Sequence, residues 1–258
     1  MIRLGDEKAT LLDHLRELHL PTVRSSFEEM ARRAEQETLS YERYLLELTE
    51  RECQVRRQNR VERWLRQSKL PLEKDLPGFD LKRLPTKIAR QVRTLLDGTF
   101  VDRQENVLAF GKPGSGKTHL LCAIGQELIR NNRKVYFSSC SLMVQELLIA
   151  KRDLKLSRLL KRLAGYDALI LDDLGYVQQS REEMEVLFTL LAERYERGSV
   201  MITSNLPFSK WEAIFKDPMT TAAVIDRLVH HSVILELNLP SYRMEQAKRG
   251  KTPSKDKA

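Results

Sequence analysis

An eight-residue stretch, GKPGSGKT from Gly111 to Thr118, carries the most restrictive pattern in this 258-residue chain. It matches G-x-x-x-x-G-K-[ST] at every required position; an apolar run over 107–110 precedes it, and apolar residues at helical spacing follow it. Glycines let such a loop adopt positive φ, so its backbone N–H groups approach phosphate oxygens at the start of the helix. The sequence therefore predicts a strand, a phosphate-binding loop and a helix; the alternative is a glycine-rich turn that binds nothing.

The chemistry of this loop defines the expected cofactors, ATP and Mg²⁺. Lys117 is expected to contact the β- and γ-phosphates in catalysis, and Thr118 to ligate Mg²⁺ through its hydroxyl. The residues expected to bind the nucleotide are Gly111, Lys112, Pro113, Gly114, Ser115, Gly116, Lys117, Thr118 and His119.

A pair of acids follows a second apolar run, over 168–171. Asp172 is expected to hold Mg²⁺, through water, and Asp173 to orient and polarise the attacking water as a catalytic residue. The alternative is a strand terminus with two solvated acids.

A further β-type run, over 200–204, ends in Asn205. Thr203 or Asn205 is expected to hydrogen-bond the γ-phosphate or the attacking water, and Asn205 is the catalytic candidate. The alternative is a plain turn, because Asn205-Leu206-Pro207 is typical turn chemistry.

Five short β-type runs separated by helical segments predict an α/β fold with a parallel sheet. They lie at 107–110, 135–138, 168–171, 200–204 and 233–237. An additional strand between the loop and the acidic strand, followed by the polar strand, indicates a five-stranded AAA+ core of the P-loop class. We expect a small all-α domain over 1–70, a linker over 71–90, the ATPase domain over 91–242 without a C-terminal helical lid, and a basic tail over 243–258.

The net charge of +8 is concentrated in segments 51–93, with 13 basic and 5 acidic side chains, and 151–165, with 6 basic and 1 acidic. Cationic side chains recur at helical spacing in both, which suits contact with duplex DNA phosphates without base reading. Solvated faces or subunit contacts are the alternative. The expected DNA contacts are Lys151, Lys155, Arg158 and Arg162 on one continuous helix, and Arg56, Arg57, Arg60 and Arg63 on another.

Two further arginines are candidates for the nucleotide site. Arg227 lies on a predicted helix before the last strand, which would present it to the γ-phosphate of a neighbouring subunit; the alternative is a surface charge pair with Asp226. Arg243 either contacts the nucleotide from the C-terminal side or begins the basic tail.

The composition excludes membrane and secreted classes. The longest apolar runs fall far short of the ~18 residues that a membrane span requires, and the charged N-terminus has no apolar segment behind it. Three cysteines and five histidines form no zinc pattern, and Cys53, Cys122 and Cys140 are expected to be buried in a reducing compartment. We therefore expect a cytoplasmic protein without a membrane partner.

Taken together, these motifs resemble the IstB family, the AAA+ ATPase helpers of insertion-sequence transposases. The likeness covers almost the whole chain, including Phe79 and Asp80 at the domain entrance. The matching stretches are 111–120 (GKPGSGKTHL), 172–177 (DDLGYV), 180–182 (SRE), 192–198 (AERYERG), 202–208 (ITSNLPF), 226–232 (DRLVHHS) and 241–243 (SYR).

The resemblance implies a homo-oligomer that forms with ATP on duplex DNA, remodels the target site and delivers it to a cognate transposase. It also implies that Arg227 acts in trans and that the helix over 151–162 faces DNA. The chain departs from many AAA+ proteins, which have Asp-Glu where Asp172-Asp173 stands; the shorter second acid implies slow ATP hydrolysis, stimulated by DNA or the partner.

Two other functions are considered beside this one. A helicase loader of the DnaC type uses the same core and would bind a hexameric helicase, usually through the N-terminal part. A small-molecule kinase would be a monomer that is indifferent to DNA, against which the basic segments and Arg227 argue.

Overall fold

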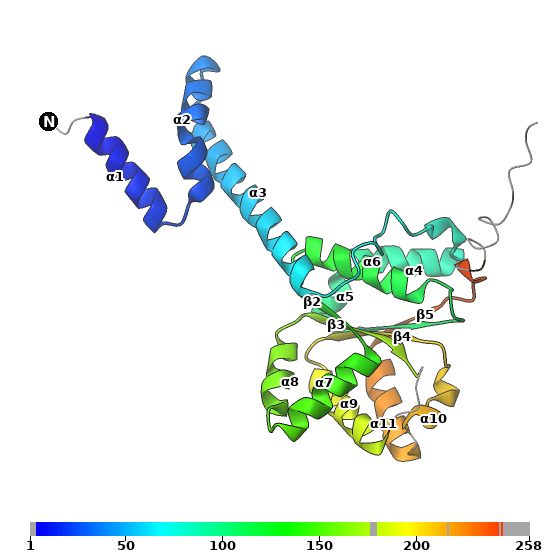
Figure 1. Cartoon of the computed structure of the whole chain (residues 1–258). Coiled ribbons are helices and arrows are strands. Elements are labelled where there is room, and N and C mark those ends of the chain that lie inside the picture. Colours follow the sequence, from blue (N-terminus) through cyan, green and yellow to red (C-terminus); the bar gives the residue numbers. More distant parts are fainter. Residues whose placement is uncertain (1–3, 176–179, 216, 243, 245–258) are drawn as a thin grey trace, which may run out of the picture. The chain divides into compact units, whose positions relative to one another are not determined.

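The computed structural model describes residues 4–175, 180–215, 217–242 and 244, and the chain forms two compact units, Met1–Arg63 and Trp64–Ala258 (Figure 1). The boundary falls within a long helix. None of the described helices is long and apolar enough to cross a membrane.

The first unit is helical, with a small apolar core made by Leu15, Val23 and Leu48. Its helices are α1 (Leu4–Glu17), α2 (Pro21–Gln36) and α3 (Tyr41–Gln67), the last of which continues into the second unit. Proline opens α2, where its missing N–H costs no helical hydrogen bond. Cys53 is exposed, contrary to prediction, because the buried face of α3 is set by Leu48 and Glu52.

Glu52 is a buried carboxylate that holds the start of α2 against α3. Its Oε2 accepts the N–H groups of Thr22 and Val23 at 2.8 and 3.1 Å, and its Oε1 pairs with Arg56 at 2.7 Å. Burial alone would raise the pKa of Glu52, but the hydrogen bonds from Arg56 and the two backbone groups offset this, so the pKa lies below its usual value.

Replacing Glu52→Gln should loosen the first turn of α2, because the amide makes weaker hydrogen bonds than the charged group. We expect amide hydrogen exchange at Thr22 and Val23 to quicken by about 2- to 30-fold. In the unmodified chain, protection should be full above the ordinary pKa of 4.5 and be lost as the pH falls through the lowered pKa. Glu50→Gln, at an exposed position of α3, is the control, and equal exchange in the two variants would contradict the assignment.

The second unit is built on a five-stranded sheet in the order β2-β3-β4-β1-β5, with all neighbouring pairs parallel. The strands are β1 (Asn106–Phe110), β2 (Val135–Ser139), β3 (Ala168–Leu174), β4 (Ser199–Ser204) and β5 (Ser232–Glu236). This confirms the predicted fold class. Because β1 lies between β4 and β5, the loop that follows β1 opens beside the carboxyl end of β4.

Helices cover both faces of the sheet (Figure 1). One face carries α4 (Thr86–Leu96), α5 (Thr99–Asp102) and α6 (Lys117–Arg130); the other carries α7 (Cys140–Arg152), α8 (Leu156–Ala164), α9 (Arg181–Arg194), α10 (Glu212–Phe215) and α11 (Pro218–Val229). Two short 3₁₀ helices are η1 (Leu81–Arg83) and η2 (Phe208–Lys210). Within the described residues, β5 is followed by an extended segment over 237–241 and not by a helical lid.

The basic segment 151–162 is not one helix, and the prediction of a continuous stripe there was wrong. α7 ends at Arg152, Leu154 has a φ of 57°, and α8 begins at Leu156. The chain turns there because Leu159 of α8 packs into the same apolar core as α7. Lys151 and Arg162 therefore lie on different helices, and Arg56, Arg57, Arg60 and Arg63 do share one helix, α3.

Arg194, at the end of α9, joins the amino-terminal ends of two strands. Its buried guanidinium donates to the carbonyl oxygens of Leu163, Tyr166, Asp167 and Ser199 at 2.8 to 3.3 Å. Burial lowers the pKa of Arg194 to about 10, which still leaves it charged at neutral pH. One side chain thus satisfies four carbonyl groups from the end of α8, the loop before β3 and the start of β4.

Replacing Arg194→Lys should lower the free energy of unfolding of the second unit by about 2–4 kcal/mol, because an ammonium has fewer donors and cannot replace all four buried hydrogen bonds of the guanidinium. Both tryptophans, Trp64 and Trp211, belong to this unit, so tryptophan fluorescence during urea unfolding measures it. Arg197→Lys is the control, since Arg197 is exposed and forms a surface ion pair with Glu193. A loss below 1 kcal/mol would show that the four hydrogen bonds matter little.

Candidate nucleotide-binding site

The predicted phosphate loop lies between β1 and α6, with the N-terminus of α6 directed at it. Gly114 and Gly116 have φ angles of 79° and 94°, the left-handed region that favours glycine. A Cβ atom at Gly114 would also overlap the side chain of Ser241. The loop therefore depends on glycine both for its curvature and for the close approach of another segment.

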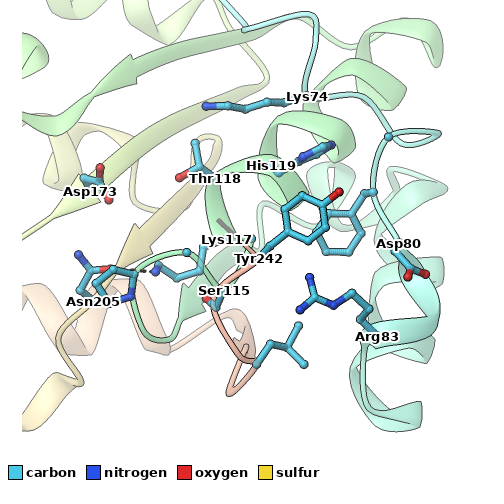
Figure 2. Close-up of a pocket in the computed structure, with 16 residues that line it drawn as sticks. Lys74, Asp80, Arg83, Ser115, Lys117, Thr118, His119, Asp173, Asn205 and Tyr242 are labelled. Atoms are coloured by element: carbon cyan, nitrogen blue, oxygen red, sulfur yellow. Dashed lines mark hydrogen bonds between the residues drawn. The ribbon is translucent and has the colours of Figure 1, made fainter. Parts of the chain in front are cut away.

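Lys117 joins the loop to the end of β4. Its buried ammonium donates to the carbonyl oxygens of Gly111 and Lys112 at 2.8 and 3.1 Å and to Oδ1 of Asn205 at 2.8 Å. Figure 2 shows this contact between the Lys117 and Asn205 side chains. The structure thus brings two of the predicted catalytic residues together, although Lys117 begins α6 and Asn205 follows β4.

The two acids at the end of β3 have different surroundings. The Asp172 carboxylate is buried and accepts a hydrogen bond from Thr203 Oγ1 at 2.6 Å, whereas the Asp173 carboxylate is exposed and lines a cavity beside the loop. The pairing of β3 with β4 shifts in register between Leu171 and Leu174, and Asp173 has a φ of 60°. Of the two acids, Asp173 is therefore the one that faces the site.

The segment before η1 forms one wall of the cavity. The Phe79 ring packs edge-on against His119 with centroids 5.4 Å apart, and His119 Nε2 lies 2.8 Å from the carbonyl oxygen of Asp75. The carboxylate of Asp75 accepts the N–H of Gly78 at 2.8 Å. These contacts fix an aromatic side chain next to the first turn of α6.

The segment after β5 also lines the cavity, through Leu239 and Tyr242. The N–H of Leu237 donates to Phe110 at 2.7 Å, and the N–H of Tyr242 donates to Gly114 at 3.0 Å. The Arg83 guanidinium lies 5.1 Å from the centre of the Tyr242 ring. Arg243, the predicted nucleotide contact from this side, lies outside the described residues.

These walls enclose a cavity of about 340 Å³ with two chemically different ends (Figure 2). Lys117, Thr118, Asp173 and Asn205 lie at one end, and Tyr242 and Arg83 at the other. A phosphate chain suits the first end and a planar base suits the second. The cavity is lined by Lys74, Gly78, Phe79, Asp80, Arg83, Pro113, Gly114, Ser115, Gly116, Lys117, Thr118, His119, Asp173, Asn205, Leu239 and Tyr242.

The phosphate end also offers the donor set that Mg²⁺ prefers. The Thr118 hydroxyl and the Asp173 carboxylate supply hard oxygen atoms on the same wall (Figure 2). Asp172 does not line the cavity, so its role as a Mg²⁺ ligand stays a prediction.

Most of the cavity end that suits a base carries no motif from which a site could be predicted. The prolines and Gly78 around the linker marked an extended segment, and no local pattern says which loop such a segment crosses. The cavity-lining residues without a predicted site role are Lys74, Gly78, Phe79, Asp80, Arg83, Leu239 and Tyr242.

Arg227 does not line the cavity of its own chain. It is half-buried on α11, donates to the carbonyl oxygen of Ala223 at 2.9 Å and lies 5.1 Å from the centre of the Phe188 ring. If Arg227 contacts a nucleotide, that nucleotide is therefore bound in the cavity of another subunit.

The predicted DNA contacts vary in their surroundings. Lys151 pairs with Glu185 at 2.7 Å and Arg162 with Glu146 at 2.5 Å, while Arg56 pairs with Glu52. Arg60 is half-buried. Lys155 lies 3.9 Å from a carboxylate oxygen of Asp153, and all the predicted DNA contacts other than Arg60 are exposed.

A parallel sheet in the order β2-β3-β4-β1-β5, with a phosphate loop after β1, acids after β3 and a polar residue after β4, defines an AAA+ P-loop ATPase core. Residues 13–250 match the family model described as IstB-like ATP binding protein. The chain belongs to this family.

Similar proteins carry names from insertion sequences. An insertion sequence ATP-binding protein of Sinorhizobium fredii is 40% identical over 95% of this chain and 83% of its own length. The insertion sequence IS21 ATP-binding protein of Pseudomonas aeruginosa is 36% identical over 94% of this chain and 91% of its own length. Among solved structures, AMPPCP-bound DnaA from Aquifex aeolicus shares the fold with a TM-score of 0.55 and 18% identity, over 73% of this chain and 58% of DnaA.

Replacing Lys117→Ala should weaken ATP binding by about 10- to 150-fold, because a charged, hydrogen-bonding group at the phosphate end is lost. Titration with a fluorescent ATP analogue measures the effect. Lys87→Ala, at an exposed position of α4 that does not line the cavity, is the control. If Lys117→Ala binds ATP as tightly as the unmodified chain, this end of the cavity does not bind the phosphates.

Proposed function

We propose that this chain hydrolyses ATP as an oligomer assembled on duplex DNA in the cytoplasm, and that it remodels a target site and delivers it to the transposase of an insertion sequence. The observation that carries the proposal is the location of Arg227. Among the described residues, the cavity of one chain holds Lys117, Asp173 and Asn205 at its phosphate end, and no described arginine lies at that end. An arginine from a neighbouring subunit would complete it.

In the proposed reaction, water attacks the γ-phosphate, the bond between the β- and γ-phosphates breaks, and ADP and phosphate result. Lys117 holds the β- and γ-phosphates, Asp173 orients and polarises the water, and Asn205 hydrogen-bonds the γ-phosphate or the water. Mg²⁺, held by Thr118 and, through water, by Asp172, would neutralise the charge that develops on the phosphates. Hydrolysis is expected to be slow until DNA or the partner is bound.

The exposed cations support contact with DNA. Arg57, Arg63 and Arg158 are exposed and can contact phosphates, as can Lys155, which lies 3.9 Å from Asp153. Contacts of this kind, from cationic side chains to phosphates, carry no base information. Binding should therefore show little base specificity and should fall steeply with salt concentration. The partner is proposed from the relatives, whose names join ATP binding to insertion sequences.

Two variants that lose ATP hydrolysis for different reasons test whether Arg227 acts on the nucleotide of a neighbouring subunit. Lys117→Ala lacks the phosphate contact but keeps Arg227, and Arg227→Ala keeps the phosphate contact. We expect each alone to lose at least about 10²-fold in DNA-stimulated ATP hydrolysis, and a mixture of the two to regain a measurable fraction, since some interfaces combine an intact cavity with an intact arginine.

Light scattering on duplex DNA with ATP or ADP measures assembly in the same samples. Arg197→Ala, an exposed arginine on the turn after α9, is the control and should assemble as the unmodified chain does. No recovery in the mixture would contradict action in trans. A monomer indifferent to DNA that binds a hexameric helicase would favour a loader instead.

A further inference from the structure

Thr203, at the end of β4, is fully buried, and its hydroxyl has two partners on the neighbouring strand. Oγ1 donates to Oδ1 of Asp172 at 2.6 Å and accepts the N–H of Asp173 at 2.8 Å. A hydroxyl has a single proton, so its capacity to donate is used by Asp172. Thr203 does not line the cavity. The geometry therefore directs Thr203 toward the acids, and leaves Asn205 as the polar group of β4 that reaches the phosphate end.

The backbone at Asp173 explains why this contact matters. Asp173 has a φ of 60°, which residues other than glycine rarely adopt, although aspartate and asparagine do so more readily than most. Its neighbours Asp172 and Leu174 are 8% and 2% exposed, whereas the Asp173 carboxylate reaches the cavity. A conformation that is unfavourable by itself persists only where surrounding contacts hold it. The hydrogen bond from the Asp173 N–H to Thr203 is such a contact.

We infer that Thr203 is a positioning residue: it holds Asp173 in the left-handed conformation and so fixes where the Asp173 carboxylate meets the attacking water. The inference rests on the proposed function, in which Asp173 orients that water. It also gives a physical reason for an aspartate at this position, because a longer acid enters the left-handed region less readily. The same hydroxyl satisfies the buried Asp172, so one side chain sets the placement of both acids.

Removing the hydroxyl with Thr203→Val keeps the shape of the side chain. We expect kcat for ATP hydrolysis to fall by about 10- to 100-fold, because the water-orienting carboxylate is misplaced, while the ATP Kd changes by less than about 3-fold, because Lys117 is untouched. Thr203→Ser restores the hydroxyl and should keep kcat within about 3-fold. Thr189→Val is the matched control, since the Thr189 hydroxyl donates to the carbonyl oxygen of Glu185 in its own helix, away from the acids.

A double variant separates positioning from direct contact with phosphate. With Asp173→Asn already present, adding Thr203→Val should cost kcat little more, since the carboxylate that Thr203 positions has gone. A full further loss in that background, or an ATP Kd raised more than about 10-fold by Thr203→Val alone, would place Thr203 on the nucleotide and overturn the inference.

Amide hydrogen exchange at Asp173 tests the contact without relying on hydrolysis. The Asp173 N–H should be protected in the unmodified chain and in Thr203→Ser, and should exchange faster in Thr203→Val; Thr203→Ala serves if the valine variant does not fold. Equal exchange in all variants would overturn the inference. If the chain hydrolyses no ATP but the Asp173 N–H still exchanges faster in Thr203→Val than in Thr203→Ser, the proposed function is overturned. The hydrogen bond by which Thr203 positions Asp173 is then still supported.

Discussion

The buried ammonium of Lys117 is the group around which the site is arranged. A charge taken out of water is tolerated only when it is fully hydrogen-bonded, and here the partners are two loop carbonyls and Asn205. The carbonyls converge because glycines let the loop curve back on itself. Asn205 arrives because β4 lies beside β1 in the sheet. The loop conformation, the strand order and the polar end of β4 thus all provide hydrogen-bond acceptors for the buried ammonium of Lys117.

The parts of the molecule that could be predicted are those with a local signature. A phosphate loop is a short pattern in which each residue type has its own reason, and buried parallel strands are short apolar runs, so 107–110 and 168–171 were recognisable without tertiary information. The same holds for the acids at 172 and 173, which stand directly after such a run. The parallel pairing of β1 with β4 then brings Asn205 to the loop, as the order of the motifs suggested.

The parts that could not be predicted depend on contacts between distant segments. Phe79 and Tyr242 are 163 positions apart and line the same cavity. No local sequence pattern predicts that these two residues lie close together. The turn between α7 and α8 is imposed by packing of leucines into a shared core, which overrides a helical repeat of lysine and arginine. The different surroundings of Asp172 and Asp173 follow from a register shift, which no composition reveals.

The guanidinium of Arg194 has a consequence for how such a protein would respond to its nucleotide. Its hydrogen bonds to four carbonyl oxygens link the amino-terminal ends of β3 and β4 to the end of α8, and these bonds replace the water that such carbonyls would otherwise bind. The amino-terminal ends of these strands therefore have little freedom to rearrange. The carboxyl-terminal ends are held by single hydroxyl, amide and ammonium groups, which can exchange protein partners for phosphate oxygens. We therefore expect differences between nucleotide states to lie at the carboxyl ends of the strands.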